Sequence, residues 1–390
     1  MLQKSVSGPR LRRLPPPGND LFLLGAMAAL LVLGAVMVYS ASVSLGQGAT
    51  TAAREDIFLR HVAATLVAVA AGTAASRLSM QFWQKHAFFC FFFGVGLLAL
   101  VLVVGKEANG ARRWFALGPL TFQPAEMVKL LAILYAADFC ARKKEVLHKV
   151  GKGLLPMAAV LVLVGALLLL EPDFGSFVSI ALVVLAVMFC AGMRMGPFLV
   201  LGVLGILAFA ALIISSPYRM QRMMAFLDPF GDPYGEGYQL THALIAFGRG
   251  GITGVGLGAS VEKLHYLPEA HTDFIFAVLA EELGLLGVLV VMGIYFALSL
   301  RLFRAGTRAA VRKQWFSSFF AHGVGVWFSL QTIINMGVTM GVLPTKGLTM
   351  PLMSYGGSAN LAIICALMLV ARVELENRRF ERGYPPCKNW

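Results

Sequence analysis

The sequence has little charge, and acidic residues are especially scarce. Charged residues make up 14% of the 390 residues, with 20 Asp and Glu against 33 Lys and Arg, whereas a soluble domain carries roughly a quarter charged residues. Apolar residues reach 58%, and the mean hydropathy is +0.75. This balance excludes an ordinary soluble domain and predicts a protein that lies mostly in a membrane.

Cysteines are few, and the common catalytic motifs are absent. No cysteine has the spacing of a metal site, and all five fall in apolar runs or in segments expected inside the cell, so no external disulfide is expected. The sequence contains no HExxH or GxSxG motif. Its glycine-rich stretch 248–258 does not fit a nucleotide-binding loop. The five cysteines are Cys90, Cys140, Cys190, Cys365 and Cys387.

The apolar residues gather in ten runs of about 20 residues, the length that a helix needs to cross a bilayer. The fourth run is the most polar, because it begins with Glu126 and Lys129. The sequence therefore predicts an all-α polytopic membrane protein with about ten transmembrane helices. The runs are centred near Leu31, Val67, Leu98, Leu131, Val162, Val183, Leu204, Val288, Val326 and Leu367.

The basic residues predict the orientation of the chain. With the N-terminus inside, most Lys and Arg but few Asp and Glu fall in inner segments, so the positive-inside rule places both termini in the cytoplasm. The net charge of +13 then serves to anchor the chain at the inner leaflet, and no nucleic-acid partner is expected. We expect a cytoplasmic tail over 1–20, a single transmembrane domain over 21–372 and a cytoplasmic tail over 373–390.

Two outer segments are longer and more irregular than the rest. Residues 215–272 form a polar, glycine-rich stretch between the seventh and eighth predicted helices, and loops of that length are usually functional. Residues 341–358 contain Lys346 and a glycine pair, and glycines let the backbone approach a ligand closely. Both segments are expected to lie on the outer face.

The stretch from Leu267 to Gly284 gathers ionisable residues where the eighth predicted helix begins. Ionisable residues at the membrane boundary are costly and typical of a functional site. Asp273 is either a carboxylate base or the N-cap of the helix, and Thr272 could cap it equally well. Glu269 is a competing base, and His271 is more typical of a hydrogen-bonding partner.

Three further acids and a lysine also allow two interpretations each. Glu281 and Glu282 fall inside the eighth run, where a carboxylate must face the protein interior. They are either structural partners of an inward basic group, which we favour, or part of the site. Glu126 and Lys129 share a helix face at i, i+3. They form either a self-neutralising pair or a polar pocket in which Lys129 meets a phosphate.

Outer arginines could anchor lipid headgroups or bind an anionic lipid-linked substrate. Arg112 and Arg113 precede Trp114, a pattern typical of interfacial anchors. Arg219 and Arg222 open the long outer stretch. Arginine binds phosphate in a bidentate manner, so a convergence of these residues near a carboxylate would favour the substrate interpretation.

A series of ordered motifs resembles one known family, the SEDS proteins (shape, elongation, division and sporulation). The resemblance runs from about Leu21 to Arg372, and Ala246–Gly251 is similar to the division branch of the family. Ala125, in place of serine, and Glu171, in place of glutamine, depart from the pattern. The matching motifs are Tyr39–Ser42, Asn109–Trp114, Gln123–Glu126, Pro172–Gly175, Phe226–Pro229, Gly237–Gln239, Leu267–Gly284, Leu343–Gly347 and Ser354–Ser358.

The resemblance implies a peptidoglycan glycosyltransferase that polymerises lipid II at the division septum of a bacterial inner membrane. It implies that Asp273 is the general base and that Glu126 and Lys129 line a lipid-facing cavity. A divalent cation, Mg²⁺ or Mn²⁺, could assist, and no organic cofactor is expected. The candidates for the substrate pyrophosphate are Lys129, Arg113, Arg219, Arg222 and Lys346, with Glu269, His271, Glu282 and Asp173 in support.

The resemblance also implies partners: a class B penicillin-binding protein, division regulators and membrane lipids. Two other functions remain open from the residues, a lipid II flippase and a non-catalytic division scaffold. Because the ionisable candidates gather in the outer half of the chain, chemistry on the outer face is favoured over transport through both leaflets. A scaffold gives no reason for that cluster.

Overall fold

The computed structural model describes residues 20–42, 51–108, 111–117, 120–147, 149–194, 217–235, 237–264, 266–345 and 347–383, with isolated positions between 196 and 214. The described part is mostly helical. Its helices are α1 (Leu21–Ser42), α2 (Thr51–Arg77), α3 (Met80–Val104), α4 (Pro124–Lys143), α5 (Leu155–Leu170), α6 (Phe174–Cys190), α8 (Pro217–Leu227), α9 (Tyr238–Gly250), α10 (Ile275–Val311), α11 (Trp315–Thr339) and α12 (Gly357–Glu381), with short turns η2 (Lys144–Val146) and η3 (Val150–Leu154).

Length and hydropathy identify membrane-spanning helices within the described part of the chain. Six helices there are long and apolar enough to cross a bilayer, so the prediction of a multi-pass membrane protein is confirmed. The helix α6 is apolar but shorter. The run predicted near Leu204 falls largely outside the described residues. The six segments are Leu21–Ser42, Asp56–Arg77, Met80–Val104, Val150–Leu170, Ile275–Val311 and Gly357–Glu381.

The bundle has an interior made of α4 and α11. The helix α4 packs against α3, α6, α11 and α12, and α11 also packs against α10. Most residues of both helices are buried, including Trp327 and Phe328 on α11. Because neighbouring helices surround α4, its polar residues meet protein rather than lipid, which explains why the fourth predicted run could be so polar.

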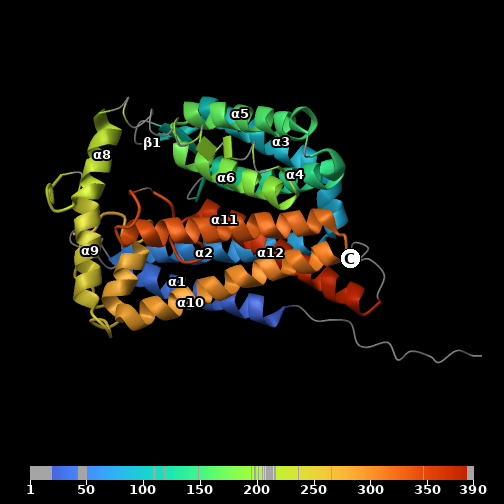
Figure 1. Cartoon of the computed structure of the whole chain (residues 1–390). Helices are drawn as coiled ribbons and strands as arrows, with labels where there is room; N and C mark the ends of the chain where they lie inside the picture. The colour runs from blue at the N-terminus through green and yellow to red at the C-terminus, as the bar shows by residue number, and fades with distance from the viewer. Residues whose placement is uncertain are drawn as a thin grey trace, which may run out of the picture.

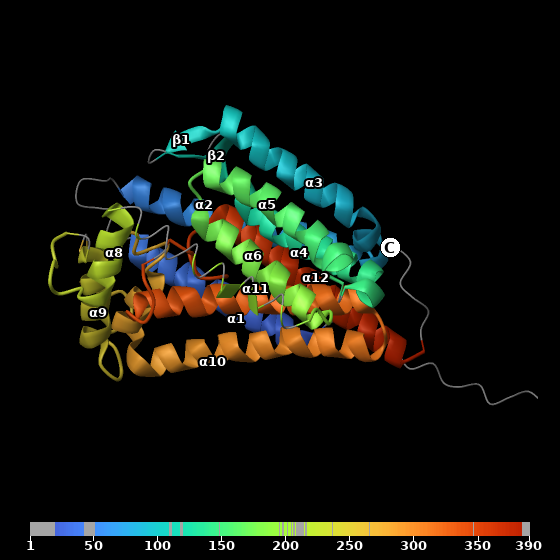
Figure 2. The same ribbon diagram turned by 45° about the horizontal axis from the view of Figure 1, so that its top comes forward.

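The arrangement of the helices separates two ends of the molecule. Figures 1 and 2 show α10, α11, α1, α2 and α12 running along one direction, with α3, α4, α5 and α6 beside them. The helices α8 and α9 lie across one end of this bundle. The C-terminal end of α12 lies at the opposite end.

The prediction of an entirely α-helical fold is wrong in one segment. Three short antiparallel strands, β1 (Lys106–Ala108), β2 (Ala111–Leu117) and β3 (Leu120–Phe122), form a sheet in the order β1-β2-β3 between α3 and α4. Strand β2 is rich in aromatic and aliphatic residues, which suit a pleated surface. The stretch was too short and too polar to appear among the apolar runs.

Helix also occurs in two segments outside the predicted spans. The long stretch 215–272 includes α8 and α9. The helix α12 continues to Glu381, beyond the boundary expected at residue 373. Pairs at i, i+4 support this extension, because Arg372 contacts Glu376 at 2.9 Å and Arg378 contacts Glu374 at 3.0 Å.

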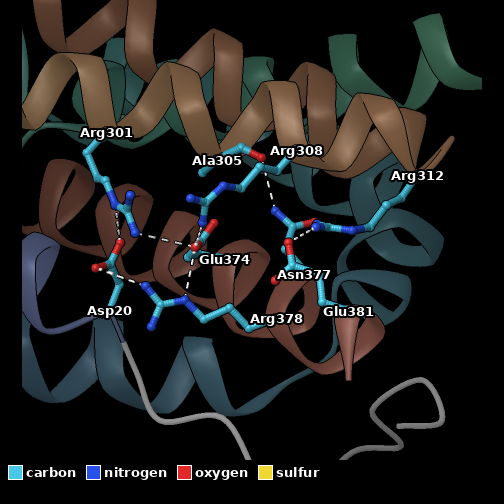
Figure 3. A network of polar contacts seen from close by, with 9 residues as sticks. All are labelled: Asp20, Arg301, Ala305, Arg308, Arg312, Glu374, Asn377, Arg378 and Glu381. Atoms are coloured by element: carbon cyan, nitrogen blue, oxygen red, sulfur yellow. Dashed lines mark hydrogen bonds and ion pairs between the residues drawn. The ribbon is translucent and has the colours of Figure 1, made fainter. Parts of the chain in front are cut away.

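A charge network joins α1, α10 and α12 at the end where α12 finishes (Figure 3). Asp20, just before α1, accepts from Arg301 at 2.5 Å and pairs with Arg378 at 3.2 Å. Glu374, which is 1% exposed, contacts Arg301, Arg308 and Arg378. Since each of these acids has several guanidinium partners, the network fixes the helix ends relative to one another.

Candidate active site

Asp273 lies immediately before α10, at the end of the bundle where α8 and α9 are found. The N-cap of α10 is Phe274, and no side chain caps the helix. The interpretation of Asp273 or Thr272 as the N-cap is therefore wrong. Within the described part of the chain, no group donates a hydrogen bond to the Asp273 carboxylate, whereas the Thr272 hydroxyl bonds Glu269 Oε2 at 2.6 Å.

Main-chain contacts hold Asp273 in place. The Nδ2 of Asn335, on α11, donates to Asp273 O at 2.9 Å and to Leu348 O at 2.6 Å. Ser354 Oγ donates to Thr272 O at 2.5 Å, and Tyr355 N donates to His271 O at 3.0 Å. The start of the Leu267–Gly284 stretch and the 341–358 segment, both singled out in the sequence, thus lie against each other.

Gly347 leaves the space that the Asp273 carboxylate occupies. A Cβ atom at this glycine would lie 2.8 Å from Asp273 Oδ2, closer than real Cβ contacts. A larger residue would therefore displace the carboxylate or the segment that carries Gly347. This contact explains why the 341–358 segment needs glycine at this position.

The surroundings of Asp273 favour its protonated form more than water does. Burial, helped by the charge of Glu269, raises the pKa of Asp273 to about 7. Burial also lowers the pKa of His271, against the opposing charge of Glu269. His271 is therefore neutral at pH 7 and supplies no cation to Asp273. A carboxylate with a pKa near 7 suits a general base that works at neutral pH.

Glu281 and Glu282, farther along α10, each have hydrogen-bond partners from the loop before the helix. Lys263 Nζ contacts Glu282 Oε1 at 2.6 Å and Ser40 Oγ at 2.7 Å, and Lys263 and Glu282 are 2% and 1% exposed. Glu281 accepts from Ser260 Oγ at 2.5 Å and Val261 N at 3.0 Å. The interpretation as a structural partner of an inward basic group is confirmed for Glu282. The sequence did not reveal that Lys263 is that group.

Backbone hydrogen bonds also hold the loop that carries Lys263 against α10. Val255 N donates to Glu281 O at 3.0 Å and Gly256 N donates to Glu282 O at 3.1 Å. Gly284 has φ 65°, and a Cβ there would lie 2.3 Å from Gly254 N. Gly284 therefore allows a kink in α10, and the loop residues Ile252 and Gly254 pack closely against the helix at this kink.

Glu126 and Lys129 form the self-neutralising pair, with Lys129 Nζ 2.6 Å from Glu126 Oε1. Both are buried on α4. The N-terminus of α4 is tied to the start of α12, because Gln123 N donates to Ser358 Oγ at 2.9 Å. The helix that carries the pair is therefore tied to the Ser354–Ser358 segment, which in turn contacts the segment of Asp273. Lys129 already has an anionic partner in Glu126.

Arg113 and Asp173 support the backbone around the sheet. Arg113 donates through Nε to Glu171 O at 2.8 Å and through Nη2 to Pro172 O at 2.7 Å. Asp173 caps α6 by accepting from Ser176 N at 3.1 Å and also accepts from Gln123 Nε2 at 3.3 Å. The side chains of Arg219 and Arg222 and the whole of Lys346 lie outside the described residues.

Glu171 has an environment that the sequence did not explain. Its side chain is fully buried, and neither carboxyl oxygen has a hydrogen-bond partner in the described part of the chain. Burial first, then the charge of Asp173, raises its pKa to about 8, while Arg113 opposes the shift. The carboxyl is therefore mostly neutral at pH 7, so it can occupy a position where the family pattern has an amide.

The described residues offer no ready-made metal site. No cluster of three or more His, Cys, Asp or Glu among them could hold an ion. The use of Mg²⁺ or Mn²⁺ stays a prediction.

Comparison with known proteins places this geometry in a family. The FtsW/RodA/SpoVE family, described as cell cycle proteins, matches residues 21–379. The chain belongs to this family. The resemblance to the SEDS proteins, of which FtsW and RodA are members, is confirmed.

Relatives match over nearly the whole length of the FtsW/RodA/SpoVE domain. A probable peptidoglycan glycosyltransferase FtsW of Aromatoleum aromaticum is 49% identical over 368 residues, covering 93% of this chain and 90% of that protein. The protein of the same name from Nitrosomonas europaea is 46% identical over 386 residues, covering 98% and 99%.

Solved structures share the fold. A chain from a peptidoglycan synthase complex, solved for the coordination of polymerization and crosslinking, has a TM-score of 0.74 at 32% identity and covers 92% of this chain and 98% of that chain. The crystal structure of the Thermus thermophilus rod shape determining protein RodA has a TM-score of 0.67 at 30% identity, with coverages of 93% and 97%.

Proposed function

We propose that this protein is a peptidoglycan glycosyltransferase that polymerises lipid II during cell division, with Asp273 as its general base. The observation that carries the role of Asp273 is its isolation. It is a partly buried carboxylate that has no donor in the described part of the chain and a pKa near 7. The relatives named as peptidoglycan glycosyltransferases support the reaction class.

The chemical step transfers one sugar chain to another. The 4-hydroxyl of the acceptor N-acetylglucosamine gives its proton to the Asp273 carboxylate as its oxygen attacks the anomeric carbon of the donor N-acetylmuramic acid. The bond from that carbon to the lipid pyrophosphate breaks, and the anomeric configuration inverts. General-base assistance contributes about 10²–10⁴-fold to the rate. Holding both lipid-linked substrates in one orientation removes a further entropic barrier.

The departing pyrophosphate needs cationic partners. Of the five candidates, Lys129 is already paired with Glu126 and Arg113 is occupied by two carbonyl groups. We therefore assign the main stabilisation to Arg219, Arg222 and Lys346, with Arg113 using its remaining N–H groups. Loss of one such electrostatic stabiliser costs about 10²–10³-fold in rate.

The proposal includes the membrane orientation and the partners of the protein. The chain crosses the inner membrane about ten times, both termini lie in the cytoplasm, and residues 215–272 and the Asp273 segment face outward. The distribution of Lys and Arg supports this orientation. A class B penicillin-binding protein at the septum cross-links the product, in keeping with the related synthase complex that coordinates polymerization and crosslinking. Division regulators control the pair.

The test is lipid II polymerisation by the purified protein together with its penicillin-binding partner. Asp273→Asn should give no glycan strands while remaining folded and bound to the partner. Asp232→Asn, the same chemical change at an exposed aspartate of the outer stretch, should polymerise like the wild type.

Each other outcome has a distinct meaning. Equal polymerisation by Asp273→Asn and the wild type would remove Asp273 from the reaction and make Glu269 the next candidate. No polymer from the wild type within an intact complex would favour a flippase or a scaffold. Movement of labelled lipid II between leaflets of a vesicle would then separate those two functions.

A further inference from the structure

The kink at Gly284 changes the hydrogen-bond partners of the residues that follow it in α10. In a regular α-helix, each backbone N–H donates to the carbonyl four residues earlier. Beyond the kink, Leu285 N donates instead to Gly251 O at 2.9 Å, and Leu286 N donates to Ile252 O at 3.1 Å. Carbonyl groups of the loop between α9 and α10 thus replace carbonyl groups of the helix.

The same loop also satisfies the helix carbonyls that the kink leaves without their usual donors. These carbonyls belong to Glu281 and Glu282, and they accept from Val255 N at 3.0 Å and Gly256 N at 3.1 Å. The close approach needs glycine, because a Cβ at Gly254 would lie 2.2 Å from Glu282 O. The loop and the kinked helix therefore complete each other's backbone hydrogen bonds.

The kink lies at one edge of the part of α10 that can cross hydrocarbon. The stretch Leu283–Leu300 contains no charged residue and is bounded by Glu282 and Arg301. As a helix it is about 27 Å long, close to the hydrocarbon thickness of about 30 Å. Arg301 belongs to the charge network at the far end of the bundle (Figure 3). Gly284 therefore lies at the hydrocarbon boundary on the Asp273 side.

The loop that bonds to this kink has an apolar and uncharged surface. Residues 250–261 contain no Asp, Glu, Lys or Arg. Ile252 and Leu257 are 67% and 63% exposed. On α10, Leu285 and Leu286 are exposed as well, and exposed apolar residues continue along the helix through Leu289, Val290 and Phe296. The loop thus extends the exposed apolar face of a membrane-spanning helix.

The backbone of the loop is suited to an apolar environment. Irregular backbone is costly in lipid unless its polar groups have partners within the protein. The exchange with α10 supplies partners for four backbone groups of the loop, and Lys263 Nζ donates to Gly258 O at 2.8 Å. In water these bonds would not be required, and the exposed Ile252 and Leu257 would enlarge an apolar patch.

We propose that residues 251–258 form a loop immersed in the bilayer, at the hydrocarbon boundary on the Asp273 side, where Ile252 and Leu257 contact lipid acyl chains. The partner of this surface is bulk lipid, because the surface is continuous with the exposed apolar face of α10. The loop is therefore part of the membrane domain and not of the aqueous part of the segment 215–272. Its placement is independent of the Asp273 chemistry and of the proposed function.

Nitroxide labels on single cysteines test the surroundings of the loop. Ile252→Cys and Leu257→Cys are made separately in the full chain, after its five native cysteines are replaced by alanine. Both positions are exposed, so the label needs no space in the core. Leu289→Cys, on the exposed apolar face of α10, is the lipid control. Asp232→Cys, at an exposed aspartate of the segment 215–272, is the water control.

The measurement is power-saturation electron paramagnetic resonance of each labelled protein in phosphatidylcholine vesicles, with oxygen or a soluble nickel chelate as the colliding reagent. Oxygen collects in hydrocarbon, whereas the polar chelate stays in water. The labels at positions 252 and 257 should collide with oxygen as often as the label at position 289. They should collide with the chelate several-fold less often than the label at position 232. An unfolding temperature equal to that of the cysteine-free parent shows that each labelled protein is folded.

Two results would overturn the proposal. Chelate collisions at positions 252 and 257 as frequent as at position 232 would mean that the loop lies in water. Few collisions with either reagent would mean that protein, such as a second copy of this chain, covers the loop in place of lipid. Because the vesicles contain neither lipid II nor a partner protein, these results do not depend on whether the chain polymerises lipid II.

Discussion

Asp273 and Glu282 are two acids of the Leu267–Gly284 stretch with opposite surroundings. Glu282, inside α10, contacts Lys263 Nζ at 2.6 Å and also accepts from Ser40 Oγ at 2.6 Å. Asp273, just before the same helix, is held through its main-chain carbonyl by Asn335, and its carboxylate receives no donor from the described residues. One segment thus contains an acid held through its side chain, Glu282, and an acid held through its main chain, Asp273.

This difference distinguishes structural from chemical carboxylates. The Glu282 carboxylate is joined to the Lys263 ammonium and the Ser40 hydroxyl, so it connects separate segments of the fold. A carboxylate fixed through its backbone keeps both oxygens for a substrate. The contrast predicts that substitutions at the two positions change different properties of the protein.

Loss of Glu282 should have the largest effect on stability. Glu282→Gln leaves the buried Lys263 ammonium without its counter-ion, and breaking a buried pair costs about 3–5 kcal/mol. We expect a markedly lower unfolding temperature in detergent. Asp273→Asn, measured in parallel, should unfold at or above the wild-type temperature. Similar losses in both variants would abolish the distinction.

Gly347→Ala should reduce activity without a comparable loss of stability. The added Cβ would lie 2.8 Å from Asp273 Oδ2 and displace the carboxylate, and a shift of about 1 Å in a reacting group can cost about 10²-fold in rate. Polymerisation per folded complex measures the effect. Gly357→Ala, whose Cβ meets Ala64 at an ordinary 3.6 Å, is the matched control. Full activity in Gly347→Ala would mean that the carboxylate position is not critical.

The pH dependence of polymerisation should report on Asp273. Because its pKa is raised to about 7, the basic form is lost below pH 7, and kcat/KM should fall about tenfold per pH unit there. Stability changes in the opposite sense. A raised native pKa stabilises the fold fully below the unfolded value of about 3.9, and this contribution is lost as the pH rises through 7. A pH-rate profile that is flat from pH 5 to 8 would contradict the assignment.

Glu171→Gln should have the smallest effect, and one that depends on pH. Its pKa of about 8 keeps the carboxyl mostly neutral at pH 7, so glutamine should match it in unfolding temperature there. The stabilisation that protonation gives to the wild type is lost as the pH rises through 8. The variant should therefore be the more stable protein at pH 9. The exposed Glu107→Gln is the control, and an equal difference at both pH values would argue against a buried neutral acid.

The spans could be predicted because each depends on local composition. The runs near Leu31, Leu98 and Val288 lie in α1, α3 and α10, since a helix needs only about 20 apolar residues to cross a bilayer. The strands and the helices α8 and α9 have no such local signal. Strand β3 contacts α12, which is far away in the sequence, and α9 packs against α10 and α11.

The candidate site was only partly predictable for the same reason. Asp273 stood out because ionisable residues are rare near the membrane. Nothing in the sequence showed that Gly347 and Asn335 would lie against it, or that Lys263 would join Ser40 on α1 to Glu282 on α10. Such contacts depend on how the helices pack, which no single stretch of sequence contains.

The contact of Lys263 with Glu282 and Ser40 also limits how the loop before α10 can move. The segment 254–263 cannot swing away from α10 as a lid without separating a buried ion pair and the backbone hydrogen bonds of Val255 and Gly256. Opening motions that admit a lipid-linked substrate are therefore expected in the earlier part of the segment 215–272, around α8, which none of these contacts restrains. Substrate entry and catalytic geometry would then depend on different parts of the same segment.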